Sequence, residues 1–185
     1  PAGGWPRGAL TELLPERGGI GELRLLMPTL ARLSRGPRWV AWIDPPYVPY
    51  AAGLYAYGVD LAHTLVVHPR SQTERLWALE QALAAGTCAA VLGWPGALDA
   101  KASRRLQLAA ERGGSLGFLM RDPAGRYTTS HAALRLALRP ERGGLELETV
   151  KQRGGRPGAK LRLGASELFA PRWAAAGTAL QTGTS

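Results

Sequence analysis

Near its N-terminus the chain reads Thr11-Glu-Leu-Leu-Pro-Glu-Arg-Gly-Gly-Ile-Gly-Glu-Leu-Arg-Leu-Leu26. Residues 11–14 predict a short strand, and a glycine-rich turn over residues 15–21 separates it from a helical spacing of apolar side chains over residues 22–33. A glycine-rich loop between a first strand and a helix is where α/β proteins bind phosphates. This order predicts an α/β fold and makes a nucleotide site the first functional hypothesis.

Strands and helices then alternate along the chain, until the apolar period changes to two near its end. Further strands are expected over residues 39–43, 64–67, 89–92 and 115–120, and further helices over residues 51–57, 74–85 and 99–112. Residues 134–138 and 145–150 alternate on either side of a turn and predict a hairpin, and residues 161–163 predict an edge strand. We expect a mostly parallel central sheet flanked by helices, with antiparallel strands at the C-terminal edge. Residues 1–163 form one domain in this interpretation, and residues 164–185 form a flexible tail.

The glycine-rich loop departs from a phosphate-binding loop at the positions that carry its chemistry. That motif, G-x-x-x-x-G-K-[ST], uses a lysine to neutralise phosphate oxygens and a hydroxyl to hold Mg²⁺. Leu14 stands at the first glycine, Gly19 keeps the second, Ile20 replaces the lysine and Gly21 replaces the hydroxyl residue. The loop therefore predicts a structural turn without tight binding of Mg-ATP, and no cofactor is expected.

Composition narrows the class of protein further. The excess of nine positive charges lies entirely within residues 100–185, which predicts binding to a nucleic-acid backbone or to an acidic partner. The single cysteine excludes an internal disulfide framework, and no apolar run is long enough to span a membrane. The three histidines are too far apart or face opposite ways, so no metal site is expected. A cytoplasmic protein is the simplest expectation.

The order of segments resembles the RecA ATPase core, over about residues 3–163. The resemblance rests on Gly3-Gly-Trp-Pro-Arg-Gly8, Trp42-Ile-Asp44 and Tyr57-Gly-Val-Asp-Leu61, together with the helix and strand over residues 76–92. It implies a RecA-like core, but Pro46 stands where that core has its water-activating glutamate, and Trp94 where it has its magnesium-binding aspartate. We therefore expect a RecA-like domain with a degenerate nucleotide site and no enzymatic activity.

Within that superfamily, the chain resembles the ImuA family of proteins associated with translesion DNA synthesis and related to SulA. The resemblance rests on Gly19-Ile-Gly-Glu-Leu-Arg-Leu-Leu26, Arg104-Arg-Leu-Gln-Leu-Ala-Ala110 and Lys151-Gln-Arg-Gly-Gly-Arg-Pro-Gly158. It implies a non-catalytic accessory protein of the bacterial DNA-damage (SOS) response. Its implied partners are ImuB, a Y-family polymerase homologue without catalytic residues, the RecA filament and, indirectly, an error-prone C-family polymerase.

Two groups of basic residues are the candidate binding residues. The residues Lys151, Arg153 and Arg156 lie in a Gly- and Pro-rich hairpin, and the RecA resemblance implies that the first two contact a neighbouring protomer. Arg121 and Arg126 border the position of a DNA-contacting loop in RecA, and Lys160 adds a third cation, so weak DNA binding is expected there.

Two other functions remain open. One is a SulA-type cell-division inhibitor that binds the tubulin-like division protein FtsZ. The other is a divergent RecA-like ATPase, against which Ile20 argues because it cannot neutralise a phosphate.

Overall fold

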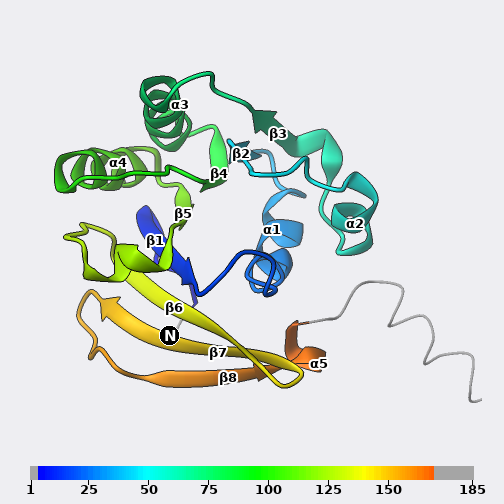
Figure 1. Cartoon of the computed structure of the whole chain (residues 1–185). Helices are drawn as coiled ribbons and strands as arrows, with labels where there is room; N and C mark the ends of the chain where they lie inside the picture. Colours follow the sequence, from blue (N-terminus) through cyan, green and yellow to red (C-terminus); the bar gives the residue numbers. More distant parts are fainter. Residues whose placement is uncertain (1–3, 169–185) are drawn as a thin grey trace, which may run out of the picture.

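The fold of residues 4–168 is described by a computed structural model (Figure 1). The strands are β1 (Ala9–Pro15), β2 (Trp39–Ile43), β3 (Thr64–Val67), β4 (Cys88–Gly93), β5 (Leu116–Met120), β6 (Leu134–Glu141), β7 (Gly144–Gln152) and β8 (Lys160–Gly164). The helices are α1 (Met27–Leu33), α2 (Ala51–Ala56), α3 (Gln72–Ala84), α4 (Ala100–Gly113) and α5 (Ala165–Leu168), with 3-10 turns η1 (Leu61–His63) and η2 (Pro123–Tyr127). Among these helices none has the length and apolar character that crossing a membrane requires.

The strands form one sheet in the order β3-β2-β4-β5-β1-β6-β7-β8. The strands from β3 to β6 run parallel to one another, and β7 and β8 continue the sheet in antiparallel pairing. β1 lies inside the sheet, where Thr11 pairs with Phe118 of β5 on one side and with Leu134 of β6 on the other. All seven residues of β1 are buried. The parallel and antiparallel parts of the sheet meet at β6, which pairs in parallel with β1 and antiparallel with β7.

Two apolar clusters lie on the two faces of the sheet. One joins Leu26, Met27 and Leu30 to strand residues such as Trp42 and Phe118. The other joins side chains of α3 and α4 to the opposite face. The two helices approach each other closely, because a Cβ added at Gly113 would lie 2.0 Å from the backbone oxygen of Leu83.

Side-chain caps explain where the two long helices begin, with Ser71 at the start of α3 and Asp99 at the start of α4. The Asp99 carboxylate accepts a 2.7 Å hydrogen bond from the amide of Ala102 and so caps the N-terminus of α4. α4 ends where Gly114 adopts a left-handed conformation with φ of 61°. By contrast, the helix predicted over residues 22–33 begins only at Met27, because Pro28 favours the first turn of a helix and is excluded from its interior.

The predicted RecA-like core, a mostly parallel sheet flanked by helices, is wrong as an account of this fold. The sheet is mixed: the antiparallel strands β6, β7 and β8 form a ribbon that extends beyond the region covered by α1 to α4 (Figure 1). A tight turn between Glu141 and Gly144 connects β6 to β7 as a hairpin. Antiparallel strands joined in this way need no crossover helix, so the chain adds no helix on this end of the sheet between them. Of the predicted tail, residues 164–168 complete β8 and form α5, and the remainder lies outside the described residues.

Candidate binding crevice

A cavity of about 760 Å³ opens at the carboxyl ends of β1, β2, β4 and β5. This edge of a parallel sheet is where α/β proteins usually bind their ligands. The crevice is lined mainly by aromatic and apolar side chains, namely Leu23, Trp42, Pro45, Pro46, Tyr47, Val48, Pro49, Tyr50, Trp94 and Met120. Such a lining favours an apolar partner surface over a phosphate.

The glycine-rich loop forms one wall of the crevice and is closed by the chain's own carboxylate. The amides of Gly19 and Gly21 each donate a 3.1 Å hydrogen bond to Glu22. Successive backbone amides of this kind form anion-binding concavities, and here the anion is internal. Ile20 packs against the apolar core, and Leu14 is buried in β1. These contacts give the loop a structural role and leave the amides of Gly19 and Gly21 occupied.

The two positions at which a RecA-like site would carry carboxylates lie in the crevice but hold apolar side chains. Pro46 and Trp94 both line it, and the Trp94 ring stacks on Trp42 with centroids 6.0 Å apart. The nearest carboxylate after β2, Asp44, forms an ion pair with Arg75. Within residues 4–168, no three His, Cys, Asp or Glu side chains come together as a potential metal site.

The rim of the crevice carries a group of exposed aromatic side chains that the sequence analysis did not identify. We call residues 47–55 the aromatic segment. Tyr47 and Val48 are 84% and 83% exposed, Tyr50 is 78% exposed, and Tyr55 on α2 is also exposed. Large apolar side chains that gather on one exposed segment beside a cavity are typical of a protein–protein interface. In the sequence, Tyr47, Val48 and Tyr50 stand among three prolines with no helical or strand period, and this pattern does not indicate which side chains are exposed.

The three basic residues expected to bind DNA each form an ion pair with a carboxylate. Arg121 is buried and donates to Glu12 at 3.2 Å. Arg126 donates to Glu148, and this hydrogen bond lowers the pKa of the Glu148 carboxyl. Lys160 lies 3.3 Å from Glu146. Each cation would have to exchange its carboxylate for a phosphate, and DNA binding at these residues stays a prediction.

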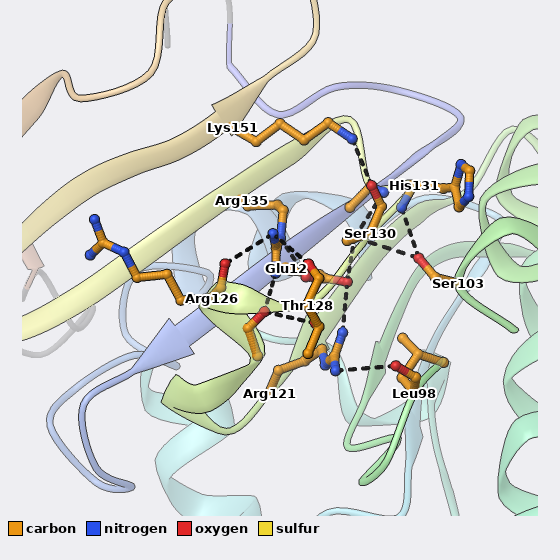
Figure 2. A network of polar contacts seen from close by, with 12 residues as sticks. Glu12, Leu98, Ser103, Arg121, Arg126, Thr128, Ser130, His131, Arg135 and Lys151 are labelled. Carbon is orange, nitrogen blue, oxygen red and sulfur yellow. Dashed lines mark hydrogen bonds and ion pairs between the residues drawn. The ribbon is translucent and has the colours of Figure 1, made fainter. Parts of the chain in front are cut away.

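The contacts of Arg121 belong to a buried network around Glu12, shown in Figure 2. The Glu12 carboxylate also accepts 2.8 Å and 2.7 Å hydrogen bonds from Arg135 and the Ser130 hydroxyl. Arg121 also donates to the carbonyl of Leu98. The network ties β1 and β6 to Arg121, the residue directly after β5, and Arg121 also lines the crevice.

The three residues expected to bind a partner differ in environment. Lys151 donates a 2.8 Å hydrogen bond to the carbonyl of Ser130 (Figure 2), and burial together with the nearby positive charge of Arg135 and Arg153 lowers its pKa. Arg153 lies 3.5 Å from Glu111, and Arg156 is exposed in the turn between β7 and β8. The structure thus turns Lys151 inward and leaves Arg156 accessible. Their role in partner binding stays a prediction.

Taken together, the crevice, the glycine loop bound to its own carboxylate and the exposed aromatic segment define a mixed α/β domain with an apolar crevice at the carboxyl ends of its parallel strands. Comparison with known proteins identifies it further. Residues 8–117 match the family model described as "Cell division inhibitor SulA", which covers more than half of the chain. The chain belongs to the SulA family.

Individual relatives agree with this assignment. The SulA protein of Photorhabdus laumondii is 35% identical over 112 residues, which are 60% of this chain and 63% of that protein. The SulA protein of Edwardsiella piscicida is 33% identical over 137 residues, covering 66% of this chain and 82% of the relative. The chain thus spans less than two thirds of the length of the first relative and more than two thirds of the length of the second. The crystal structure of SulA from Pseudomonas aeruginosa superposes with a TM-score of 0.51 at 27% identity, over 60% of this chain and 96% of that one.

These matches correct the main functional prediction. The assignment to the ImuA family and to translesion synthesis is wrong, and the fold is that of SulA rather than a RecA-like core. The partners inferred from that resemblance, ImuB, RecA and the error-prone polymerase, are wrong with it. The matches support the alternative prediction, a SulA-type cell-division inhibitor, better than the main one. The family is named for inhibition of cell division rather than for a reaction.

Proposed function

We propose that this chain inhibits cell division by binding FtsZ through the aromatic segment. The observation that carries the proposal is the exposure of Tyr47, Val48 and Tyr50 beside the crevice, within the part of the chain that matches the SulA family. The relatives' names supply the process, cell division. We propose that the chain acts on cell division by binding FtsZ.

The chemistry of the segment supports recognition rather than turnover. Tyrosine provides a large contact area with few rotatable bonds, and it is enriched among the residues that dominate interface energies. Removing such an anchor costs about 2 kcal/mol or more, which corresponds to at least a roughly thirtyfold loss of affinity. The crevice behind the segment offers a hydrophobic recess for a complementary side chain of FtsZ.

A cytoplasmic site of action belongs to the same proposal. The single cysteine, Cys88, is a free thiol buried in β4. An unpaired buried thiol is consistent with a reducing compartment.

Sedimentation of FtsZ polymers tests the proposed function. FtsZ from the same organism is polymerised with GTP, and the pelleted fraction is measured as this chain is added. The wild-type chain should reduce the pellet in a concentration-dependent manner, and Tyr47→Ala/Tyr50→Ala should need at least thirtyfold more protein for the same effect.

Tyr127→Ala is the matched control, because Tyr127 is 88% exposed but lies on η2, outside the aromatic segment. It should act like the wild type. A pellet that the wild-type chain leaves unchanged would contradict the proposal, and so would a double variant that inhibits as well as the wild type.

A further inference from the structure

The backbone at the start of the aromatic rim is held in an unusual conformation. Asp44 follows directly after β2 and has a φ of 54°, the only positive φ of a non-glycine residue within the described part of the chain. Side chains disfavour this left-handed region, and aspartate is among the few that enter it. The Asp44 amide donates a 2.8 Å hydrogen bond to the carbonyl of Val67, which fixes the residue to the end of β3. Residues 45–50 leave the sheet in the direction that this backbone angle sets.

The side chain of Asp44 is held by the first turn of α3. Arg75 donates through Nε to Asp44, and through Nη1 to the side-chain oxygen of Gln72 at 2.5 Å. Gln72 in turn donates through Nε2 to the carbonyls of Pro95 and Ala97, at 2.7 and 2.8 Å. This chain of contacts joins the loop after β2 to the loop after β4.

The space around these contacts is also restricted. Gly96 has a φ of 63°, and a Cβ added there would lie 3.2 Å from Nη1 of Arg75 and 3.4 Å from the side-chain oxygen of Gln72. The loop after β4 therefore packs directly on the guanidinium group. Asp44, Arg75 and Gly96 all line the crevice, so the two loops that they connect form its walls.

We infer that the Asp44–Arg75 ion pair is a positioning device that holds the aromatic segment in the conformation that binds its partner. The inference rests on the proposed function, since it assigns a role in presenting that segment. Without its ion pair, the left-handed backbone conformation of Asp44 is less stabilised, and residues 45–50 then sample other conformations. Apparent affinity falls in proportion to the fraction of molecules that remain competent to bind. Asp44 and Arg75 thus act through Tyr47 and Tyr50 rather than by contacting the partner.

Two variants break the pair from opposite sides. Arg75→Gln removes the positive charge at similar length, and Asp44→Asn removes the negative charge with a residue that also tolerates a left-handed backbone. Arg105→Gln is the matched control, because Arg105 forms an ion pair with Glu80 that links α4 to α3 away from the crevice. Affinity for FtsZ is measured for each full chain, together with amide hydrogen exchange of residues 47–50.

Both variants should weaken FtsZ binding at least fivefold and accelerate exchange of the amides of Tyr47, Val48 and Tyr50. The double variant should be no worse than either single one, because both break the same contact. The thermal unfolding midpoint should stay near that of Arg105→Gln, which separates a local change from loss of the fold.

Wild-type exchange and affinity in both variants would overturn the inference. It is also overturned if Arg75→Gln lowers affinity while exchange of the segment stays unchanged, since Arg75 would then contact the partner directly. Failure of the proposed function is distinct: Tyr47→Ala/Tyr50→Ala would bind FtsZ as the wild type does. Exchange would still report whether the pair orders the segment.

Discussion

Replacing Glu12 with alanine is expected to destabilise the fold more than any change to a surface ion pair. Glu12 is fully buried, and its carboxylate is the counter-ion of both Arg121 and Arg135, whose side chains are each only 6% exposed. The substitution leaves two buried guanidinium groups without a negative charge. Removing one partner of a buried ion pair costs about 3–5 kcal/mol. Because one carboxylate serves two arginines, we expect the upper part of that range.

The loss is large relative to the total. Domains are stable by about 5–15 kcal/mol, and in a chain of this size each kcal/mol lowers the unfolding midpoint by roughly 2–4 °C. With a loss of about 4–5 kcal/mol, Glu12→Ala should therefore lower the midpoint by about 8–20 °C. Urea denaturation followed by tryptophan fluorescence gives the free energy of unfolding directly.

The control variant is Arg153→Ala, which removes the partner of Glu111 from an exposed pair at 3.5 Å and leaves the contact between Glu111 and Gln107 in place. Exposed pairs contribute about 0.2–1 kcal/mol, so this variant should remain close to the wild type. The apolar triple variant Glu12→Leu/Arg121→Met/Arg135→Met should recover much of the stability that Glu12→Ala loses, because it leaves no unpaired charge. A free energy of unfolding for Glu12→Ala within about 1 kcal/mol of the wild type would refute the reasoning.

Three further predictions concern packing, acid stability and the thiol. Gly113→Ala should lower the free energy of unfolding by about 1–3 kcal/mol, because its Cβ would meet the Leu83 backbone, whereas Gly18→Ala, with open space around it, should be close to neutral in the same urea titration. Since Arg126 lowers the pKa of Glu148 in the folded chain, the stability from this pair is present above the unfolded value near 4.5 and is lost as pH falls through the lowered value. Glu148→Gln should therefore flatten the dependence of the unfolding midpoint on pH below 4.5, and an unchanged slope would count against the pair. Burial raises the pKa of the Cys88 thiol, so its reaction with a disulfide reagent should be slow in the native chain and fast in urea, and equal rates would contradict its burial.

Local elements were predictable where local chemistry determines them. Asp99 and Gly114 mark the two ends of α4 by capping, which depends on residues within one turn. The alternation on either side of Gly144 marked the β6–β7 hairpin, because a period of two is specific to strands. Helix α1 began later than its apolar period indicated, because the restriction that Pro28 imposes outweighs that pattern.

Features that depend on distant contacts could not be predicted in this way. Glu12 pairs with Arg121 and Arg135, which lie 109 and 123 residues away along the chain. The sequence of β1 therefore carried no local sign of a buried ion network. The exposure of Tyr47 and Tyr50 follows from how the loop after β2 leaves the sheet, which the sequence pattern does not describe.

The error in family assignment has a physical origin too. A strand, a glycine-rich turn and a helix recur in many α/β proteins, because they solve the same chain-reversal problem at the edge of a parallel sheet. The spacing of Gly19, Asp44 and Trp94 therefore reported the order of the elements rather than the family. Ile20, Pro46 and Trp94 were compared with a RecA-like core that this fold does not share, so these departures carry no information about the family.

Hydrogen-exchange mapping of this chain in complex with FtsZ tests the central claim most directly. We predict that FtsZ slows exchange in residues 47–57, which include the aromatic segment. Residues 151–163, the end of β7, the turn after it and most of β8, form a basic ribbon that should keep the exchange rates of the free chain. Protection confined to the basic ribbon, or no protection in residues 47–57 at saturating FtsZ, would contradict the account.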